Sequence, residues 1–199
     1  MVTMGRRAPD STPDLALSFA NTFELSRGRI RDRIATPHDL RSWLAGEFSD
    51  KASIIESLRS PPVARTVHDE ALRLRSAIRE LLETYSAGTA AGPGTILVIN
   101  RALVTCTITH EVVVSGGVLT VREQERGGSP LALLAPIARS AGVLLAGVDR
   151  GRLRRCAAPR CPVWFVDSSK GGRRRWCSMA RCGNRRKAAR HRERNPPES

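Results

Sequence analysis

The sequence predicts an α+β protein: a mainly helical N-terminal body with a small antiparallel β-hairpin or sheet, followed by a small C-terminal module built from a β-hairpin and a helix. Apolar residues recur at helical spacing through most of the first three quarters of the chain, a segment near residue 110 alternates like a strand, and the last quarter holds two pairs of cysteines. We expect a disordered N-terminus over 1–11, the body over 12–148, the cysteine module over 149–195 and a tail over 196–199.

Helix starts are marked by a threonine followed by proline, at 12–13 and again at 36–37. Threonine caps the free N–H groups of a first turn, and proline suits the first helical position. Leu15, Phe19 and Phe23 recur every fourth residue, so we expect the first helix to extend across Phe23.

The longest helix is predicted over 63–85, because apolar residues in this stretch share one face and Gly88 follows as a stop signal. A short helix over 54–58 precedes it, ended by the Ser60-Pro61-Pro62 run.

A last body helix starts at Ser129-Pro130 and ends near Gly147. The apolar stretch over 131–148 is interrupted by Pro136 and Arg139, which predicts a buried helix rather than a membrane span. We therefore expect no membrane partner.

One segment of the body is strand-like. Residues 107–115 alternate, Gly116-Gly117 marks a tight turn, and residues 118–121 return, which predicts a β-hairpin. Residues 96–106 are apolar and fit either a helix or a strand, and Cys106 within them is expected to be a small buried hydrophobe.

The charge is distributed unevenly. The chain carries 33 Lys and Arg against 19 Asp and Glu, a net charge of +14, and the last 50 residues account for 16 of the basic and 3 of the acidic side chains. A neutral body with a cationic end is typical of a chain that binds a polyanion. The alternative is a solvated tail that only raises solubility.

The cysteines point to a metal. Arg6-Arg7 is not followed by an apolar stretch, so no export signal is visible and we expect a cytoplasmic protein, associated with the nucleoid if it binds DNA. Thiols stay reduced in that compartment, where clustered cysteines favour metal binding over disulfides.

The cysteine spacing fits one structural Zn²⁺. Two Cys-x4-Cys pairs are separated by fifteen residues, and zinc takes four thiolates in a tetrahedron. A full set of thiolates leaves no open position for a catalytic water. The alternatives are two disulfides or a redox thiol site. The predicted ligands are Cys156, Cys161, Cys177 and Cys182.

The module around these cysteines is expected to contain a hairpin and a helix. Residues 163–166 would form one strand, 170–172 the turn and 173–176 the returning strand. A helix with an irregular start would follow over 178–194, and the last two cysteines would anchor its N-terminal end.

The basic residues of this module form the candidate nucleic-acid surface. Cationic side chains displace counterions from phosphates, whereas base recognition needs a few side chains aimed into a groove. The alternative is that these charges balance the zinc thiolates and solvate a helix face. The candidates are Arg173, Arg174, Arg175, Arg181, Asn184, Arg185, Arg186, Lys187, Arg190 and Arg194.

No catalytic constellation is discernible, so we expect no enzyme. His110-Glu111 begins a metalloprotease motif, but Val114 stands where the second histidine belongs and the segment alternates like a strand.

Short motifs in this module resemble the CGNR zinc finger. They are Arg175-Trp176-Cys177-Ser178-Met179, preceded by Phe165-x-Asp167, and the Cys-Gly-Asn-Arg run at 182–185. Members of that family usually carry an N-terminal ABATE-type domain, whose scattered motifs are similar to Phe19-Ala20-Asn21-Thr22 and Leu74-Arg75-x-Ala77-Ile78. The resemblance implies a transcription regulator, in some members linked to stress response, with a DNA-binding finger and a sensing or dimerising N-terminal domain.

Two polar residues in the body are candidate ligand-binding residues. Asn21 and Arg75 lie among apolar neighbours, where a polar side chain either satisfies a local partner or contacts a small-molecule effector. The resulting hypothesis is a zinc-dependent DNA-binding regulator, with duplex DNA as partner and a homodimer possible. The alternative is a structural zinc module that binds RNA or an acidic protein.

Overall fold

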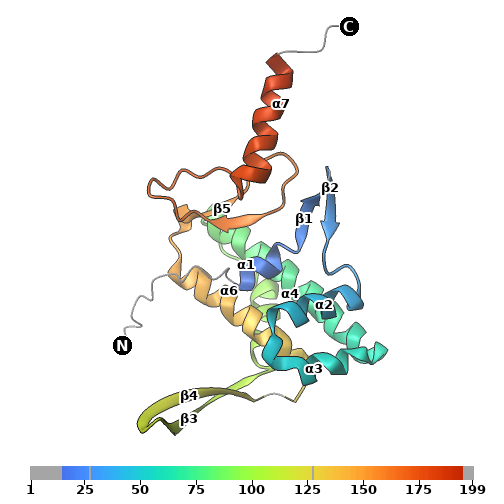
Figure 1. Cartoon of the computed structure of the whole chain (residues 1–199), viewed down its shortest axis with the longest axis vertical. Coiled ribbons are helices and arrows are strands. Elements are labelled where there is room, and N and C mark those ends of the chain that lie inside the picture. The colour runs from blue at the N-terminus through green and yellow to red at the C-terminus, as the bar shows by residue number, and fades with distance from the viewer. Residues whose placement is uncertain (1–14, 27, 127, 195–199) are drawn as a thin grey trace.

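The computed structural model describes residues 15–26, 28–126 and 128–194. Figure 1 shows a helical body with a finger above it. The finger consists of strands β5 (Leu153–Arg155) and β6 (Trp164–Val166) and of helix α7 (Asn184–Arg194), which projects away from the body. The predicted α+β class is confirmed. The expected disorder over 1–11, the helix start at 12–13 and the tail at 196–199 lie outside the described residues.

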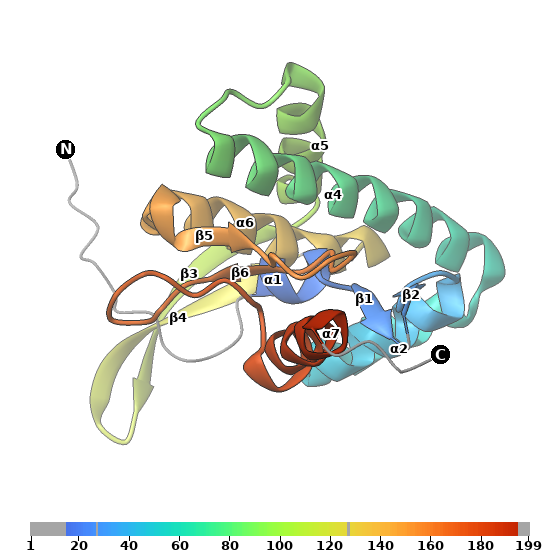
Figure 2. The same ribbon diagram turned by 90° about the horizontal axis from the view of Figure 1, so that it is seen from above.

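Helix α4 (Pro61–Ala87) is the central element of the body. It packs against four other helices, as Figure 2 shows from above: α1 (Leu15–Ala20), α2 (Pro37–Glu47), α5 (Pro93–Leu103) and α6 (Ala135–Gly147). Its apolar face is buried, and this burial stabilises the helix more than its intrinsic propensity does. Five side chains of this face are at most 1% exposed: Val67, Ala71, Leu74, Ile78 and Leu82.

Local sequence explains several helix boundaries. The Thr36 hydroxyl accepts from the N–H of Asp39, and the Asp39 carboxylate accepts from the N–H of Thr36, which closes a capping box at the start of α2. Gly88 ends α4 in the left-handed region at φ 74°, a conformation that glycine adopts without steric cost. The short helix predicted before α4 is α3 (Ala52–Glu56), followed by the 3-10 turn η2 (Ser57–Arg59).

The prediction that the first helix extends across Phe23 is wrong. Helix α1 ends at Ala20, and Phe23 begins a hairpin of strands β1 (Phe23–Ser26) and β2 (Arg29–Asp32). The ring of Phe23 lies 4.0 Å from the guanidinium carbon of Arg75 on α4, and this tertiary contact overrides the helical spacing.

The second hairpin is confirmed and is longer than predicted. Strands β3 (Thr107–Ser115) and β4 (Val118–Arg126) pair in antiparallel register and project from the body in Figure 1. The preceding segment, which fitted helix or strand, forms α5 and its C-terminal turn. Cys106 follows this turn and is half-buried.

The predicted hairpin of the finger is wrong in its pairing. Strand β6 pairs with β5, which precedes the first cysteine, instead of with residues 173–176. The buried carboxylate of Asp167 accepts hydrogen bonds from the backbone N–H groups of Ser169 and Arg174 and so turns the chain out of the sheet. Residues 173–176 have no regular structure, although the Arg175 carbonyl accepts from the N–H of Ala157.

Among the described residues, one segment is long and apolar enough to cross a membrane by composition: residues Pro130–Gly147, the 3-10 turn η3 (Pro130–Leu134) followed by α6. In the structure this segment packs against α1, α4 and α5. Leu133, Ile137 and Ala138 are fully buried, so it serves as a core helix of the body.

Candidate metal centre and nucleic-acid surface

The four predicted ligands converge in the finger, with their sulfur atoms all within 4.8 Å of one another. Cys161 Sγ lies 3.9 Å from Cys177 Sγ and 3.7 Å from Cys182 Sγ, and the last two sulfurs are also 3.7 Å apart. A tetrahedral zinc site with bonds of about 2.3 Å has an S···S edge of about 3.8 Å, whereas a disulfide requires about 2.05 Å. The geometry therefore fits one structural Zn²⁺ and excludes disulfides.

Two turns place the ligands. In the first, Arg160 adopts a left-handed backbone at φ 63° and the N–H of Cys161 bonds to the Ala158 carbonyl at 3.1 Å. In the second, the Ser178 carbonyl accepts the N–H groups of Cys182 and Gly183 within the π-helical turn η5 (Met179–Gly183). This turn leads directly into α7, as predicted, so the metal fixes the base of that helix.

A cation is needed to hold four thiolates this close together. Burial raises the pKa of the Cys161 thiol to about 11 and also raises that of Cys177. Burial acts in the same sense on Cys156, but hydrogen bonds led by the N–H of Cys177 outweigh it, so the pKa of Cys156 is lowered. Bound Zn²⁺ would supply the charge that ionises the whole set. The Arg185 guanidinium adds to this by donating to Cys182 Sγ at 3.2 Å.

Asp167 organises the interior of the finger. Its side chain is fully buried, and its Oδ1 accepts from the Ser169 hydroxyl at 2.6 Å. This bond, together with the N–H groups of Arg174 and Ser169 and the charge of Arg154, outweighs burial and lowers the pKa of Asp167. Asp167 therefore stays ionised and holds the arginine-rich stretch that follows.

The predicted nucleic-acid residues within the described side chains are all exposed. Arg174 is held by the carbonyls of Trp176 and Cys177 and by the ring of Phe165, 4.8 Å from its guanidinium carbon. Arg185 is held by the zinc ligand Cys182. Helix α7 includes Arg190 and Arg194, whose side chains lie outside the described part of the structure. The exposed set is Arg173, Arg174, Arg175, Arg181, Asn184, Arg185, Arg186 and Lys187.

An arginine cleft that the sequence did not reveal lies between the finger and the end of α4. This cleft of about 450 Å³ brings Arg174 and Arg175 together with three arginines on or next to β5: Arg150, Arg154 and Arg155. Arg154 lies 3.6 Å from Asp167 and Arg155 lies 3.9 Å from Glu83. The sequence feature that could have indicated this cleft is the run of arginines just before Cys156, which lies outside the hairpin predicted over 163–176.

The finger is docked on the body. Leu153 and Trp164, at 2% and 5% exposed, belong to the hydrophobic core of the body rather than to the small cluster around the cysteines. The Asn21 amide donates to the Trp164 carbonyl and accepts from the Trp164 N–H, each at 2.8 Å. Arg79 bridges the two parts through the carbonyls of Ala20 and Pro162.

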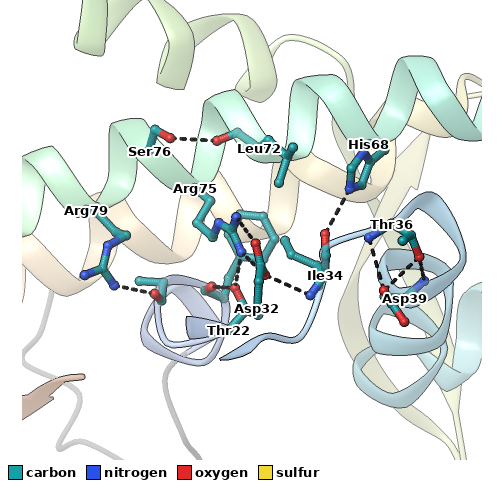
Figure 3. Close-up of polar contacts among 12 residues, drawn as sticks. Thr22, Asp32, Ile34, Thr36, Asp39, His68, Leu72, Arg75, Ser76 and Arg79 are labelled. Carbon is teal, nitrogen blue, oxygen red and sulfur yellow. Dashed lines mark hydrogen bonds and ion pairs between the residues drawn. The ribbon is translucent and has the colours of Figure 1, made fainter. Parts of the chain in front are cut away.

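The two candidate ligand-binding residues therefore have intramolecular partners. In Figure 3, Arg75 lies between Thr22 and Asp32, donating to the Thr22 hydroxyl at 2.9 Å and to both carboxylate oxygens of Asp32 at 2.6 and 2.8 Å. Asn21 also lies in the wall of a cavity of about 260 Å³ at the junction of body and finger, where Arg33 and Glu24 of the body meet Arg181 and Arg185. Arg75 does not line this cavity.

Comparison with known families agrees with this architecture. Residues 152–195 match the model of the CGNR zinc finger, and residues 13–148 match the model "ABATE: Putative stress-induced transcription regulator". The comparison with curated proteins found no match. Because the second model covers more than half of the chain, the protein belongs to the ABATE family and carries a CGNR zinc finger at its C-terminal end.

Proposed function

We propose that this protein is a zinc-dependent regulator that binds duplex DNA through its finger, and that it is not an enzyme. The observation that carries the proposal is the coupling of the metal centre to a basic surface. Cys182 lies in the turn that begins α7, and Arg185, Arg186 and Lys187 follow on the first turn of that helix, all exposed.

Zinc fixes the base of α7, so the basic residues are presented in one orientation, as a helix that enters a DNA groove requires. Phosphate contacts position such a helix, and a few side chains near its start read bases. Asn184 and Arg181 are exposed at this position, and we assign base contact to them. The arginine cleft supplies further positive charge on the same module.

The proposal is tested by fluorescence anisotropy, comparing zinc-loaded and chelated protein on genomic duplex fragments and on a random duplex over a series of salt concentrations. We expect zinc-loaded protein to select particular fragments and chelated protein to lose that preference. An affinity that is the same for all duplexes and does not change when zinc is removed would contradict the proposal. Tighter binding to a structured RNA of equal length would favour the alternative, a zinc module for RNA or an acidic protein.

For the body we propose effector sensing at its junction with the finger. The cavity that Asn21 lines contains residues from both parts, so a small molecule bound there would change how the finger is docked. Arg75 would act indirectly by holding β2. The test is thermal unfolding of wild-type and Asn21→Ala protein against a metabolite panel. A ligand that stabilises both proteins equally would remove Asn21 from the site.

We also propose that the body forms a homodimer through the β3–β4 hairpin. Val112, Val114, Leu119 and Val121 pair across the strands on one face and are 66–71% exposed. A two-stranded hairpin is marginally stable in water, and the same patch on a second copy would cover this aliphatic face around a two-fold axis. The hairpin projects at the opposite end of the molecule from α7, so such a dimer would leave both fingers free (Figure 1). We expect the protein to act in the cytoplasm, on the nucleoid.

A further inference from the structure

The β1–β2 hairpin of the body carries a row of arginines that the finger motif does not include. Arg29, Arg31 and Arg33 stand at alternate positions along β2 and just after it, and Arg27 continues the spacing outside the described residues. Side chains two apart along a strand point to the same face. All three described arginines are exposed, and none forms an ion pair with any residue in the described ranges. We call the β1–β2 hairpin with these three residues the arginine arm.

The arm is fixed to the body from its other face. Phe23, Leu25, Ile30 and Asp32 share that face, because Phe23 pairs with Asp32 and Leu25 with Ile30 in the strand register. Asp32 forms a partly buried ion pair with Arg75 (Figure 3). The Arg75 guanidinium also lies over the Phe23 ring. The open end of the hairpin, at Phe23 and Asp32, is therefore anchored to α4, whereas Ile30 nearer the turn is 55% exposed and the arginine face is left to solvent.

The arm lies beside the finger helix. Leu25 packs against the hydrophobic cluster around the cysteines. A groove of about 230 Å³ is lined by Leu25 and Gly28 on the arm and by Arg185, Arg186 and Ala189 on α7. Figures 1 and 2 show the hairpin next to the base of α7 from two directions.

The charges of the arm are not balanced locally. Glu24 stands opposite Arg31 in the register, but the two do not come within ion-pair distance in the part of the chain described here. Asp32 is engaged by Arg75 on the other face. Exposed arginines on a hairpin anchored to the body, adjacent to a basic helix, are well suited to bind successive phosphates of one backbone.

We propose that the arginine arm is a second DNA-contacting element, which binds the phosphate backbone of duplex DNA next to the site where α7 enters. This inference rests on the proposed function and extends it, because it makes the body part of the DNA interface. The finger would read sequence, and the arm would add affinity without sequence preference.

The test compares three double variants of the full-length zinc-loaded protein on one duplex fragment selected by the wild type. They are Arg29→Gln with Arg31→Gln on the arm, Arg186→Gln with Lys187→Gln on α7, and Arg65→Gln with Arg101→Gln as the matched control. The control residues are also exposed and lie on α4 and α5. Each of the three variants therefore loses two exposed positive charges.

We expect the arm variant to bind roughly fivefold to thirtyfold more weakly at 0.15 M salt and to lower the slope of log K against log salt by about 1.8, with unchanged thermal stability. The control variant should bind within about twofold of the wild type. An arm variant that matches the control while the α7 variant loses binding would overturn this inference and leave the proposed function standing. Sequence-indifferent, zinc-independent binding by the wild type would instead overturn the proposed function.

Discussion

The side-chain amide of Asn21 pairs with the backbone of Trp164 as a neighbouring strand would, giving one hydrogen bond and accepting another, each at 2.8 Å. The pair joins the residue that follows α1 to the first residue of β6, the strand that follows Cys161. Trp164 is also buried in the core of the body, so this contact couples the folding of the finger to that of the body.

Replacing Asn21 with alanine should therefore loosen the finger. Both backbone groups of Trp164 would lose their partner in a half-buried position, and we expect a loss of about 1–3 kcal/mol in the free energy of unfolding. Denaturant titration followed by tryptophan fluorescence measures this directly. Asn21→Asp should cost at least as much, because a carboxylate cannot donate to the Trp164 carbonyl.

Removing zinc should destabilise more than the finger. Without the metal the cysteine module has too small a core to remain folded. Because Leu153 and Trp164 fill the core of the body, we expect chelation or Cys177→Ser also to lower the melting temperature of the helices. Circular dichroism at 222 nm follows that transition. An unchanged transition in fully zinc-free protein would show that the finger is only tethered.

The ion pair of Arg75 and Asp32 predicts acid sensitivity. Burial acts to raise the pKa of Asp32, but the hydrogen bonds from Arg75 and the Ile34 N–H outweigh it, so the pKa lies below its usual value of 3.8. The stabilisation from a lowered pKa is present above 3.8 and is lost as pH falls through the folded-state value.

We therefore expect Asp32→Asn to remove part of this acid dependence, and to lower stability by about 3 kcal/mol at pH 7, since it leaves Arg75 buried without its charge partner. Unfolding curves at pH 7 and pH 3 provide the comparison, with Asp50→Asn as the exposed control. Equal pH dependence in the wild type and the Asp32 variant would contradict this role.

The proposed contact between α7 and DNA leads to a separate prediction. Lys187 is exposed on the first turns of α7, and if it binds a phosphate, Lys187→Gln should weaken binding to all duplexes alike and reduce the salt slope by about one. Asn184→Ala should instead reduce the difference between the selected and the random duplex. Anisotropy titrations over a series of salt concentrations separate these two outcomes.

The proposed dimer is tested at the β3–β4 hairpin. Val114 and Leu119 are directly opposed on its aliphatic face, so Val114→Glu with Leu119→Glu places like charges at a two-fold interface. We expect wild-type protein to sediment as a dimer and the variant as a monomer of unchanged helical content. A wild-type monomer at 50 to 100 µM would contradict the proposal.

The sequence by itself determined those features that depend on neighbours along the chain. The capping residues at Thr36, the glycine stop at Gly88 and the alternation over 107–121 specify local backbone conformations, and each predicted its element. The ligand set was equally determined, because the two Cys-x4-Cys pairs supply the four thiolate donors of a tetrahedral zinc site. The irregular start of α7 also followed from its sequence.

Tertiary structure decided the features that depend on distant partners. Phe23 lies in a strand and not in a helix, because two arginines of α4 contact its ring. Strand β6 pairs with β5, which precedes Cys156, because Asp167 turns the chain away from residues 173–176. Asn21 and Arg75 were predicted as ligand-binding residues because the sequence shows a polar residue among apolar ones. It does not show the intramolecular partners that these side chains contact. The arginine arm could not be predicted for the same reason: its proposed role depends on its position beside α7, which the sequence does not show.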